Sequence, residues 1–262
     1  MLLRFHADLI VGLGEIGHPL SKLLSRSYSI FGYDVNRSKM DLKKYKNIKN
    51  STVVFVHICI PFNKEFVKNI ISACKKYDPR GVVIHSTIPP RTTEYLQKRL
   101  EIPVIYSATR GIHKRMNKDL QRYTKFYSVY DLAPNATWAS KTFENRMKKA
   151  GIKTKKMSNP LVLELAKIVV DTTYYGWLIN YAQLSNMIAI KHKVDYDEMW
   201  TFAEEIHKYL GNRPKMFPGF IGGHCVIPNL NLINNDTLDL IKEINSDYAK
   251  ILKKRQAKGK KY

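Results

Sequence analysis

Gly12-Leu13-Gly14-Glu15-Ile16-Gly17 is the most informative stretch of the chain, because it joins an apolar run to a helical pattern. Between a strand and a helix, glycines at these spacings allow a tight turn, a close approach of the backbone to a pyrophosphate, and tight packing of helix on strand. The start of the helix then offers free N–H groups and a positive dipole end to the phosphates. The sequence therefore predicts a dinucleotide-binding turn that includes Gly12, Gly14 and Gly17 with Glu15 and Ile16.

Asp34 ends the next apolar run, about 20 residues after the first glycine, where an acidic residue hydrogen-bonds the ribose hydroxyls of a dinucleotide. A carboxylate at this place repels a 2′-phosphate and so favours NAD over NADP. Arg37, a few residues on, is the side chain that would instead favour NADP. We predict NAD as the cofactor.

Short apolar runs alternate with helical patterns on both sides of this motif, which is typical of βαβ units and a parallel sheet. The predicted strands are residues 7–11, 28–33, 53–60, 81–85 and 104–107, and a further strand at 126–129 is expected to complete the sheet. The predicted helices between them are residues 16–25, 64–76, 92–100 and 141–150. The fold class expected is α/β, a doubly wound parallel Rossmann sheet.

The pattern of apolar residues changes after Asn159-Pro160, where an all-helical part is expected to begin. Residues 161–192 contain one glycine and no proline, with apolar residues at helical spacing, and predict a long central helix. Helices are also expected at 195–210 and 237–253, separated by a Gly- and Pro-rich loop. We predict domains at 1–158 and 159–253 with a basic tail at 254–262, and a homodimer that buries the long helix.

Charge is the unusual feature of the composition, because 44 Lys and Arg against 22 Asp and Glu leave a net charge of +22. A field of this sign attracts nucleotides, sugar phosphates or nucleic acid, although a lysine-rich proteome would give the same excess. No apolar run is long enough to span a membrane, and the N-terminus lacks the features of a signal peptide. The odd number of cysteines, three, argues against a disulfide framework and favours a reducing, cytoplasmic location. No metal site is expected.

Ser86 and Thr87 follow the predicted fourth strand, and Pro61 follows the third. Both places belong to the carboxyl edge of a parallel sheet, where ligands bind, so these residues are predicted to contact the cofactor. The hydroxyls could equally be helix caps, together with the nearby Thr92-Thr93.

Glu164, Lys167 and Asp171 share one face of the long helix, and by themselves they indicate a solvated ladder of ion pairs. Cys225 follows Gly222-Gly223-His224, where a neighbouring His and basic surroundings would lower the pKa of a thiol. A lone Cys beside a His is usually structural.

Taken together and in this order, these motifs resemble the UDP-glucose/GDP-mannose dehydrogenase family over most of the chain. The glycine turn and Asp34 match its opening, residues 86–93 match its Ser-Thr-Val-Pro-x-Gly-Thr-Thr segment, and Ala166-Lys167 matches its helix signature. The most specific match is the family's Pro-Gly-x-Gly-Gly-His-Cys loop, which residues 218–225, PGFIGGHC, closely match.

The resemblance implies covalent chemistry on a sugar nucleotide. A thiolate at Cys225 would attack an aldehyde intermediate, and Lys167 would stabilise the developing negative oxygen. Asp171 and Asn229 would complete the catalytic group. The residues implied to contact the anionic sugar-nucleotide substrate are Thr109, Arg213, Phe220, Gly222 and Gly223.

The chain also departs from the family pattern. Asp171 replaces an asparagine, Asn229 replaces an aspartate, and Thr109 replaces a glutamate used in thioester hydrolysis, while Arg91 replaces a glycine. The family continues into a C-terminal nucleotide-gripping domain, whereas this chain ends soon after Cys225, as a truncated form would. Two alternatives therefore remain: a two-electron dehydrogenase of the β-hydroxyacid type, and a non-catalytic NAD-binding protein whose basic surface binds nucleic acid or a protein partner.

Overall fold

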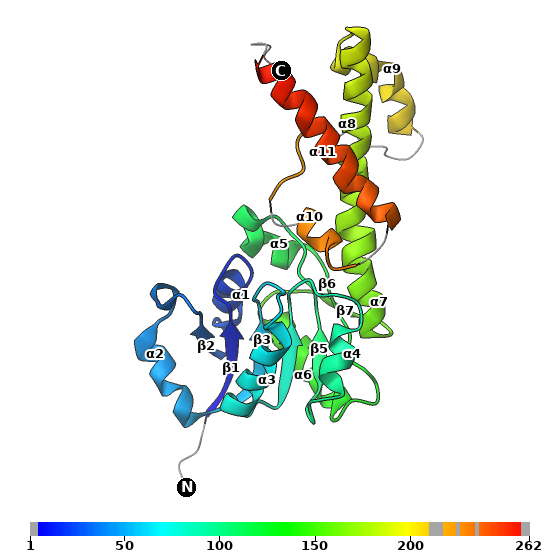
Figure 1. Ribbon diagram of the computed structural model, residues 1–262. Helices are drawn as coiled ribbons and strands as arrows, with labels where there is room; N and C mark the ends of the chain where they lie inside the picture. The colour runs from blue at the N-terminus through cyan, green and yellow to red at the C-terminus, as the bar shows by residue number, and fades with distance from the viewer. Residues whose placement is uncertain (1–4, 210–216, 224–225, 234–235, 258–262) are drawn as a thin grey trace. The chain divides into compact units, whose positions relative to one another are not determined.

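The computed structural model describes residues 5–209, 217–223, 226–233 and 236–257. It has the predicted α/β fold, in which a parallel sheet is followed by a helical region (Figure 1). The strands are β1 (Phe5–Val11), β2 (Ser29–Tyr33), β3 (Ser51–Ile58), β4 (Gly81–Ile84), β5 (Val104–Tyr106), β6 (Lys125–Tyr127) and β7 (Thr154–Lys156).

The longer helices of the sheet region are α1 (Gly17–Leu24), α2 (Leu42–Lys46), α3 (Phe66–Tyr77), α4 (Thr92–Gln97), α5 (Met116–Arg122), α6 (Ala136–Lys149) and α7 (Pro160–Leu165). Short 3₁₀ turns are η1 (Arg37–Lys39), η2 (Asn47–Asn50) and η3 (His113–Arg115). The helical region contains α8 (Tyr174–His192), α9 (Tyr196–Tyr209), α10 (Val226–Leu230) and α11 (Asp236–Ala257).

The main sheet has the strand order β2-β1-β3-β4-β5, and every pairing in it is parallel. The strand order reverses between β1 and β3, which are neighbours in the sheet although β2 separates them in sequence. In such doubly wound sheets, ligands bind beyond the carboxyl ends of the strands at this switch point. The glycine turn follows β1 and therefore lies at that point.

Apolar layers cover both faces of the sheet. One layer combines strand residues with α1, α5 and α6, and includes Leu20, Leu120 and Phe143. The other combines strand residues with α3, α4 and α7. Because successive residues of a strand point to opposite faces, both layers draw on the same strands, as the near-continuous apolar runs of the sequence predict.

The prediction that a sixth strand completes the main sheet is wrong. β6 pairs in parallel with β7, with Lys125 opposite Thr154, and forms a separate two-stranded sheet. A single antiparallel bridge between Tyr106 and Ser128 connects it to β5. Four short elements, α2, α5, β7 and α10, were not predicted, because segments this brief show no clear apolar periodicity.

The chain divides into two compact units, Met1–Lys167 and Ile168–Tyr262. The boundary expected from the sequence lies at 158/159, before α7. The predicted long helix is continuous through α7 and α8, but a π-helical segment, η4 (Ala166–Thr173), interrupts its α-helical geometry. In the second unit α11 packs along α8 (Figure 1). No helix within the described ranges is long and apolar enough to cross a membrane.

Candidate active site

The turn after β1 requires its glycines. Gly12 adopts a φ of +93°, and a Cβ there would lie 2.7 Å from the carbonyl oxygen of Cys59. A Cβ on Gly17 would lie 1.8 Å from the carbonyl oxygen of Gly12. At Gly14, by contrast, no heavy atom of the described residues other than Gly14 and its two chain neighbours lies within 4 Å of the place a Cβ would take. The turn is thus packed against the end of β3 on one side and open at Gly14, which leaves its backbone accessible to a pyrophosphate.

Asp34 connects this turn to the end of β2. Its Oδ2 accepts a hydrogen bond of 2.7 Å from the backbone N–H of Leu13, and its Oδ1 accepts one of 2.8 Å from Asn36. The carboxylate is buried but lies at the sheet edge, where a ribose would approach. Arg37 begins η1 and is exposed.

Glu15 and Ile16 lie where the turn enters α1. Ile16 directly precedes α1. The helix therefore begins at Gly17, one residue later than predicted. Glu15 is exposed, and its Oε2 lies 2.6 Å from Nδ1 of His113. This contact ties the glycine turn to the segment that precedes α5.

Ser86 joins two strand ends at the same edge. Its hydroxyl donates a hydrogen bond of 2.5 Å to the carbonyl of Ile60, next to the exposed Pro61. Ser86 is therefore not a cap of α4, and neither is Thr92, whose hydroxyl donates to the carbonyl of Pro89. Thr87 is half-buried.

Glu164 is not part of a solvated ion-pair ladder. It is fully buried, and its carboxylate accepts hydrogen bonds from the backbone N–H groups of Arg91 and Thr93 at 2.6 and 2.9 Å. The hydroxyl of Thr93 donates a third, at 2.6 Å. The Glu164 carboxylate thereby accepts hydrogen bonds from backbone N–H groups at the start of α4. Burial raises the pKa of this carboxyl group. Arg91 adopts a left-handed φ of 69° at the place where the family pattern has glycine.

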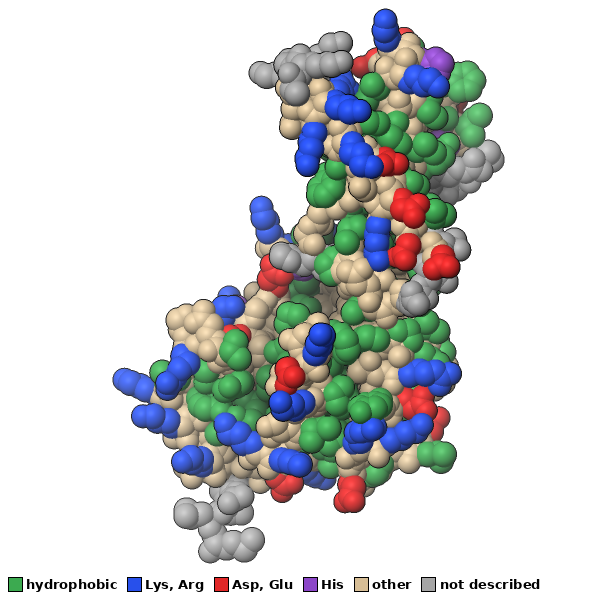
Figure 2. All heavy atoms as spheres, in the orientation of Figure 1, with side chains coloured by type: hydrophobic (Ala, Val, Ile, Leu, Met, Phe, Trp, Pro, Cys, Tyr) green, Lys and Arg blue, Asp and Glu red, His purple; other side chains and the backbone are tan. Residues whose placement is uncertain are grey.

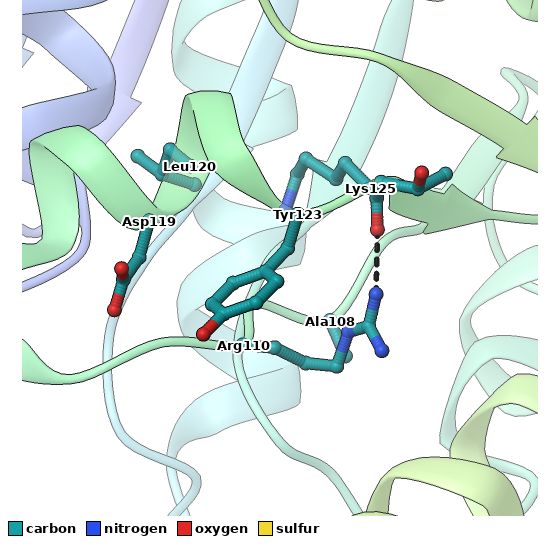
Figure 3. Close-up of a pocket in the computed structure, with 7 residues that line it drawn as sticks. Ala108, Arg110, Asp119, Leu120, Tyr123 and Lys125 are labelled. Atoms are coloured by element: carbon teal, nitrogen blue, oxygen red, sulfur yellow. Dashed lines mark hydrogen bonds between the residues drawn. The ribbon is translucent and has the colours of Figure 1, made fainter.

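Thr109 follows β5 and is buried. Its hydroxyl accepts a hydrogen bond of 3.1 Å from Nζ of Lys125, which also donates to the carbonyl of Ser107 at 2.9 Å. Lys125 lines a pocket with Arg110 and Tyr123 (Figure 3). The pocket volume of about 10 Å³ leaves room for no more than a water molecule. No sequence motif indicated a role for Lys125.

A second group that sequence analysis missed crosses the middle of the sheet. Asp8, His57, His85 and Arg146 are all buried. Nε of Arg146 lies 2.9 Å from Oδ2 of Asp8, and Nδ1 of His57 lies 2.9 Å from Nε2 of His85. Burial lowers the pKa of His85 well below its ordinary value, so the imidazole is neutral.

Lys167 and Asp171 belong to the π-helical segment η4, and such segments occur frequently at functional sites. Lys167 ends the first unit and Asp171 belongs to the second. Asn229 on α10 is buried, and its amide donates a hydrogen bond of 3.3 Å to the hydroxyl of Thr172 on η4. Within the second unit, the structure thus brings Asn229 next to the residue that follows Asp171.

The Gly-Gly loop is described from Phe217 to Gly223. Phe220 is exposed, and Gly223 adopts a φ of +77°. The backbone of Ile221 is held at both polar groups by Asn245 of α11, whose Oδ1 accepts at 2.8 Å and whose Nδ2 donates at 3.0 Å. Gly222 is exposed. Cys225 and Arg213 lie outside the described residues.

The structure therefore brings together one group of predicted residues in the first unit: the glycine turn, Asp34, Pro61, Ser86, Thr87 and Thr109 all lie at or beside the carboxyl edge of the sheet. A second group, Asp171, Asn229, Phe220, Gly222 and Gly223, belongs to the second unit.

No family model matches the chain, and no curated protein matches it by sequence. Solved structures do match. A UDP-D-ManNAc dehydrogenase from Pyrococcus horikoshii has a TM-score of 0.76 at 20% identity, covering 96% of this chain and 72% of that one. The UDP-N-acetyl-mannosamine dehydrogenase Cap5O from Staphylococcus aureus has a TM-score of 0.72 at 16% identity, covering 96% and 70%.

A 3-hydroxyisobutyrate dehydrogenase from Mycobacterium tuberculosis is similar to a lesser degree, with a TM-score of 0.59 at 12% identity over 99% of this chain and 89% of that one. At these identities the likeness is one of fold. The chain has the fold of nucleotide-sugar dehydrogenases.

Proposed function

We propose that this chain is an NAD-dependent oxidoreductase of the nucleotide-sugar dehydrogenase type, which oxidises an alcohol group of a UDP- or GDP-linked sugar. The observation that supports this most is the glycine turn, which is closed by packing at Gly12 and Gly17 and open at Gly14. The likeness in fold to UDP-sugar dehydrogenases supports the substrate class.

The residues of the first unit fit a dinucleotide. The pyrophosphate would lie along the glycine turn at the start of α1, and the Asp34 carboxylate would accept from the ribose hydroxyls. Pro61, Ser86 and Thr87 border the same edge. NAD, when bound, supplies the acceptor for the hydride that leaves the sugar.

Cys225 is proposed as the nucleophile at the aldehyde stage. Its thiolate would attack the carbonyl carbon, and the Lys167 ammonium would stabilise the negative oxygen of the resulting thiohemiacetal. Asp171 and Asn229 reverse the amide and carboxylate of the family pattern, a swap that keeps one acid and one amide. Thr109 supplies no carboxylate for thioester hydrolysis. Hydrolysis of the thioester is therefore the step in which this chain is expected to differ most from the family.

The test is NADH production, followed by absorbance, against a panel of UDP- and GDP-sugars. We expect turnover with at least one of them, and we expect Cys225→Ser to stop at or before the aldehyde while binding NAD as the wild type does. A wild-type chain that reduces no NAD with any sugar nucleotide would overturn the proposal. A Cys225→Ser variant with unchanged turnover would leave the two-electron alternative, which the fold of the hydroxyisobutyrate dehydrogenase also supports.

Thiol reactivity offers an independent measurement of the covalent step. Burial raises the pKa of Cys59 to about 12 and that of Cys74 to about 11, so neither forms much thiolate at neutral pH. We expect iodoacetamide to modify Cys225 first and NAD to slow that modification, as measured by peptide mass spectrometry. Equal rates at the three cysteines would contradict the proposed nucleophile.

We also propose that the second unit forms a homodimer through α8 and α9. These helices expose large apolar side chains: Tyr174, Tyr175, Tyr181, Leu184, Ile188, Phe202, Ile206 and Tyr209. Large exposed apolar side chains on two helices that contact each other favour a protein–protein interface. Sedimentation should give a dimer at micromolar concentration, and Leu184→Ser with Ile188→Ser should give a monomer. A monomeric wild type would contradict this proposal.

Nucleic-acid binding is the second candidate function, and one surface favours it. Lys and Arg side chains are spread over the visible face of the first unit among fewer acids (Figure 2). A groove of about 430 Å³ is lined by Tyr45, Lys46, Lys49, Lys76 and Tyr77. If this surface binds a polyanion, retention on heparin or DNA should fall steeply with salt. A small-substrate enzyme should show little such dependence.

A further inference from the structure

Lys125 is a buried lysine whose hydrogen-bond partners are neutral groups. It is 5% exposed, and its two hydrogen-bond acceptors are the Ser107 carbonyl and the Thr109 hydroxyl. Within the described part of the chain, no carboxylate forms an ion pair with it. Burying an ammonium without a counter-charge is unfavourable, so a lysine in this setting favours its neutral form.

The neutral form is accessible near physiological pH. Burial lowers the pKa of Lys125 to about 7, and the positive charges of Arg110 and Lys167 act in the same direction. At neutral pH the side chain is therefore divided between amine and ammonium. A group whose pKa lies near the working pH is the most effective at accepting a proton in a reaction.

The position of Lys125 connects it to the ligand-binding edge of the sheet. Thr109 follows β5, and its backbone N–H donates to the carbonyl of His85 at 3.2 Å, beyond the end of β4. Thr109 therefore contacts Lys125 through its hydroxyl and the strand edge through its backbone N–H. When Lys125 is an amine, the same contact of 3.1 Å lets the hydroxyl donate to Nζ.

We propose that Lys125, acting through the Thr109 hydroxyl, takes up the proton that the substrate alcohol loses when it is oxidised. The inference rests on the proposed dehydrogenase function. As the C–H bond breaks, its electron pair leaves as hydride to the oxidised nicotinamide dinucleotide, and the C–O bond becomes a carbonyl. The alcohol proton passes to Oγ1 of Thr109, the proton of Thr109 passes to Nζ, and the amine becomes an ammonium.

The first experiment compares pH profiles of NADH production from the sugar-nucleotide panel. For the wild type, kcat/KM should rise about tenfold per pH unit below pH 7 and level off above it, because the amine is the active form. Lys125→Met should lower kcat/KM by about 100-fold or more and abolish this limb. Lys125→Arg should be equally slow, because a guanidinium keeps its proton.

Matched variants separate proton transfer from structure. Thr109→Val should behave as Lys125→Met does, while Thr109→Ser, which restores a hydroxyl, should stay within a few fold of the wild type. Lys155→Met removes an exposed lysine from β7, next to β6, and should change nothing. All variants should bind NAD as the wild type does, which confirms that the glycine turn is intact.

A second readout needs no turnover. In protein labelled with ¹³Cε-lysine, the Lys125 resonance, assigned by its loss in Lys125→Met, should titrate near pH 7. A pKa above 9 would overturn the inference whatever the activity. If the wild type turns over and Lys125→Met keeps its rate and pH profile, only this inference fails. If no sugar nucleotide is oxidised, the proposed function fails and this inference fails with it.

Discussion

In the first unit, apolar side chains on both faces of the sheet form two extensive buried layers, whereas the buried apolar cluster of the described second unit consists of Ile221, Val226, Leu230 and Ile241. The second unit adds buried amides at the contact of α8 with α11, namely Asn180, Gln183, Asn186 and Asn245. Burial of apolar area stabilises a fold without specifying partners, but buried amides require matching groups at hydrogen-bond distance. The second unit therefore depends on a few particular contacts and, if the dimer forms, on a second chain.

Deleting a core ring in the first unit should have the largest effect. Phe143 is fully buried and its ring centroid lies 4.9 Å from that of Tyr127, so Phe143→Ala should lower the free energy of unfolding by about 3–5 kcal/mol. Ile241→Ala in the second unit should cost about 2 kcal/mol, because the smaller cluster can collapse around the cavity. Urea unfolding, followed by Trp138 in one unit and Trp177 in the other, measures both. Equal losses would remove the contrast between the two cores.

Removing one buried amide of the second unit should lower the free energy of unfolding by less than Phe143→Ala does, and its effect should be local. Asn245→Ala removes the partner of both backbone groups of Ile221 and one of the two acceptors of the Gln183 amide, and should lower stability by about 1–3 kcal/mol. Hydrogen exchange of residues 217–223 should rise while that of the sheet stays unchanged. The control is Ser246→Ala, one exposed residue further on. Unchanged exchange of the loop in Asn245→Ala would show that the amide does not hold it.

Lys125 is a buried ionisable group in the well-packed first unit. Its contribution to the free energy of unfolding depends on pH. Its pKa is about 7 in the folded chain and about 10.4 when unfolded, so the unfolded chain binds more protons between these values. The free energy of unfolding should therefore rise with pH from 7 to 10, by about 1.4 kcal/mol per pH unit, relative to Lys125→Met. Chemical denaturation at several pH values measures this difference. Parallel curves for the two proteins would contradict the lowered pKa.

The parts of the site that sequence predicted are local. The glycine turn and Asp34 each follow an apolar run, and they are separated by a fixed spacing. These two local features are enough to place them at the switch point of the sheet. The five strands of the main sheet were predicted for the same reason, since each is a short apolar run bounded by polar residues.

The parts that sequence missed depend on pairing between distant segments. Lys125 meets Thr109 only because β6 folds back beside β5, and Glu164 reaches Thr93 only because α7 packs next to α4. One signal was present: His57 lies within the apolar strand β3 and His85 directly follows β4, and a buried polar residue needs a partner. The identity of that partner follows from the register of the sheet, which the sequence does not display.

The most direct measurement is a calorimetric titration of NAD and of NADP into the wild-type chain, because it requires no knowledge of the substrate. We predict that NAD binds at one site per chain and more tightly than NADP, since the Asp34 carboxylate repels a 2′-phosphate. Asp34→Ala should weaken NAD binding and reduce the difference between the two dinucleotides. Absence of NAD binding, or tighter binding of NADP, would contradict the account, and in the second case Arg37 would be the residue to examine.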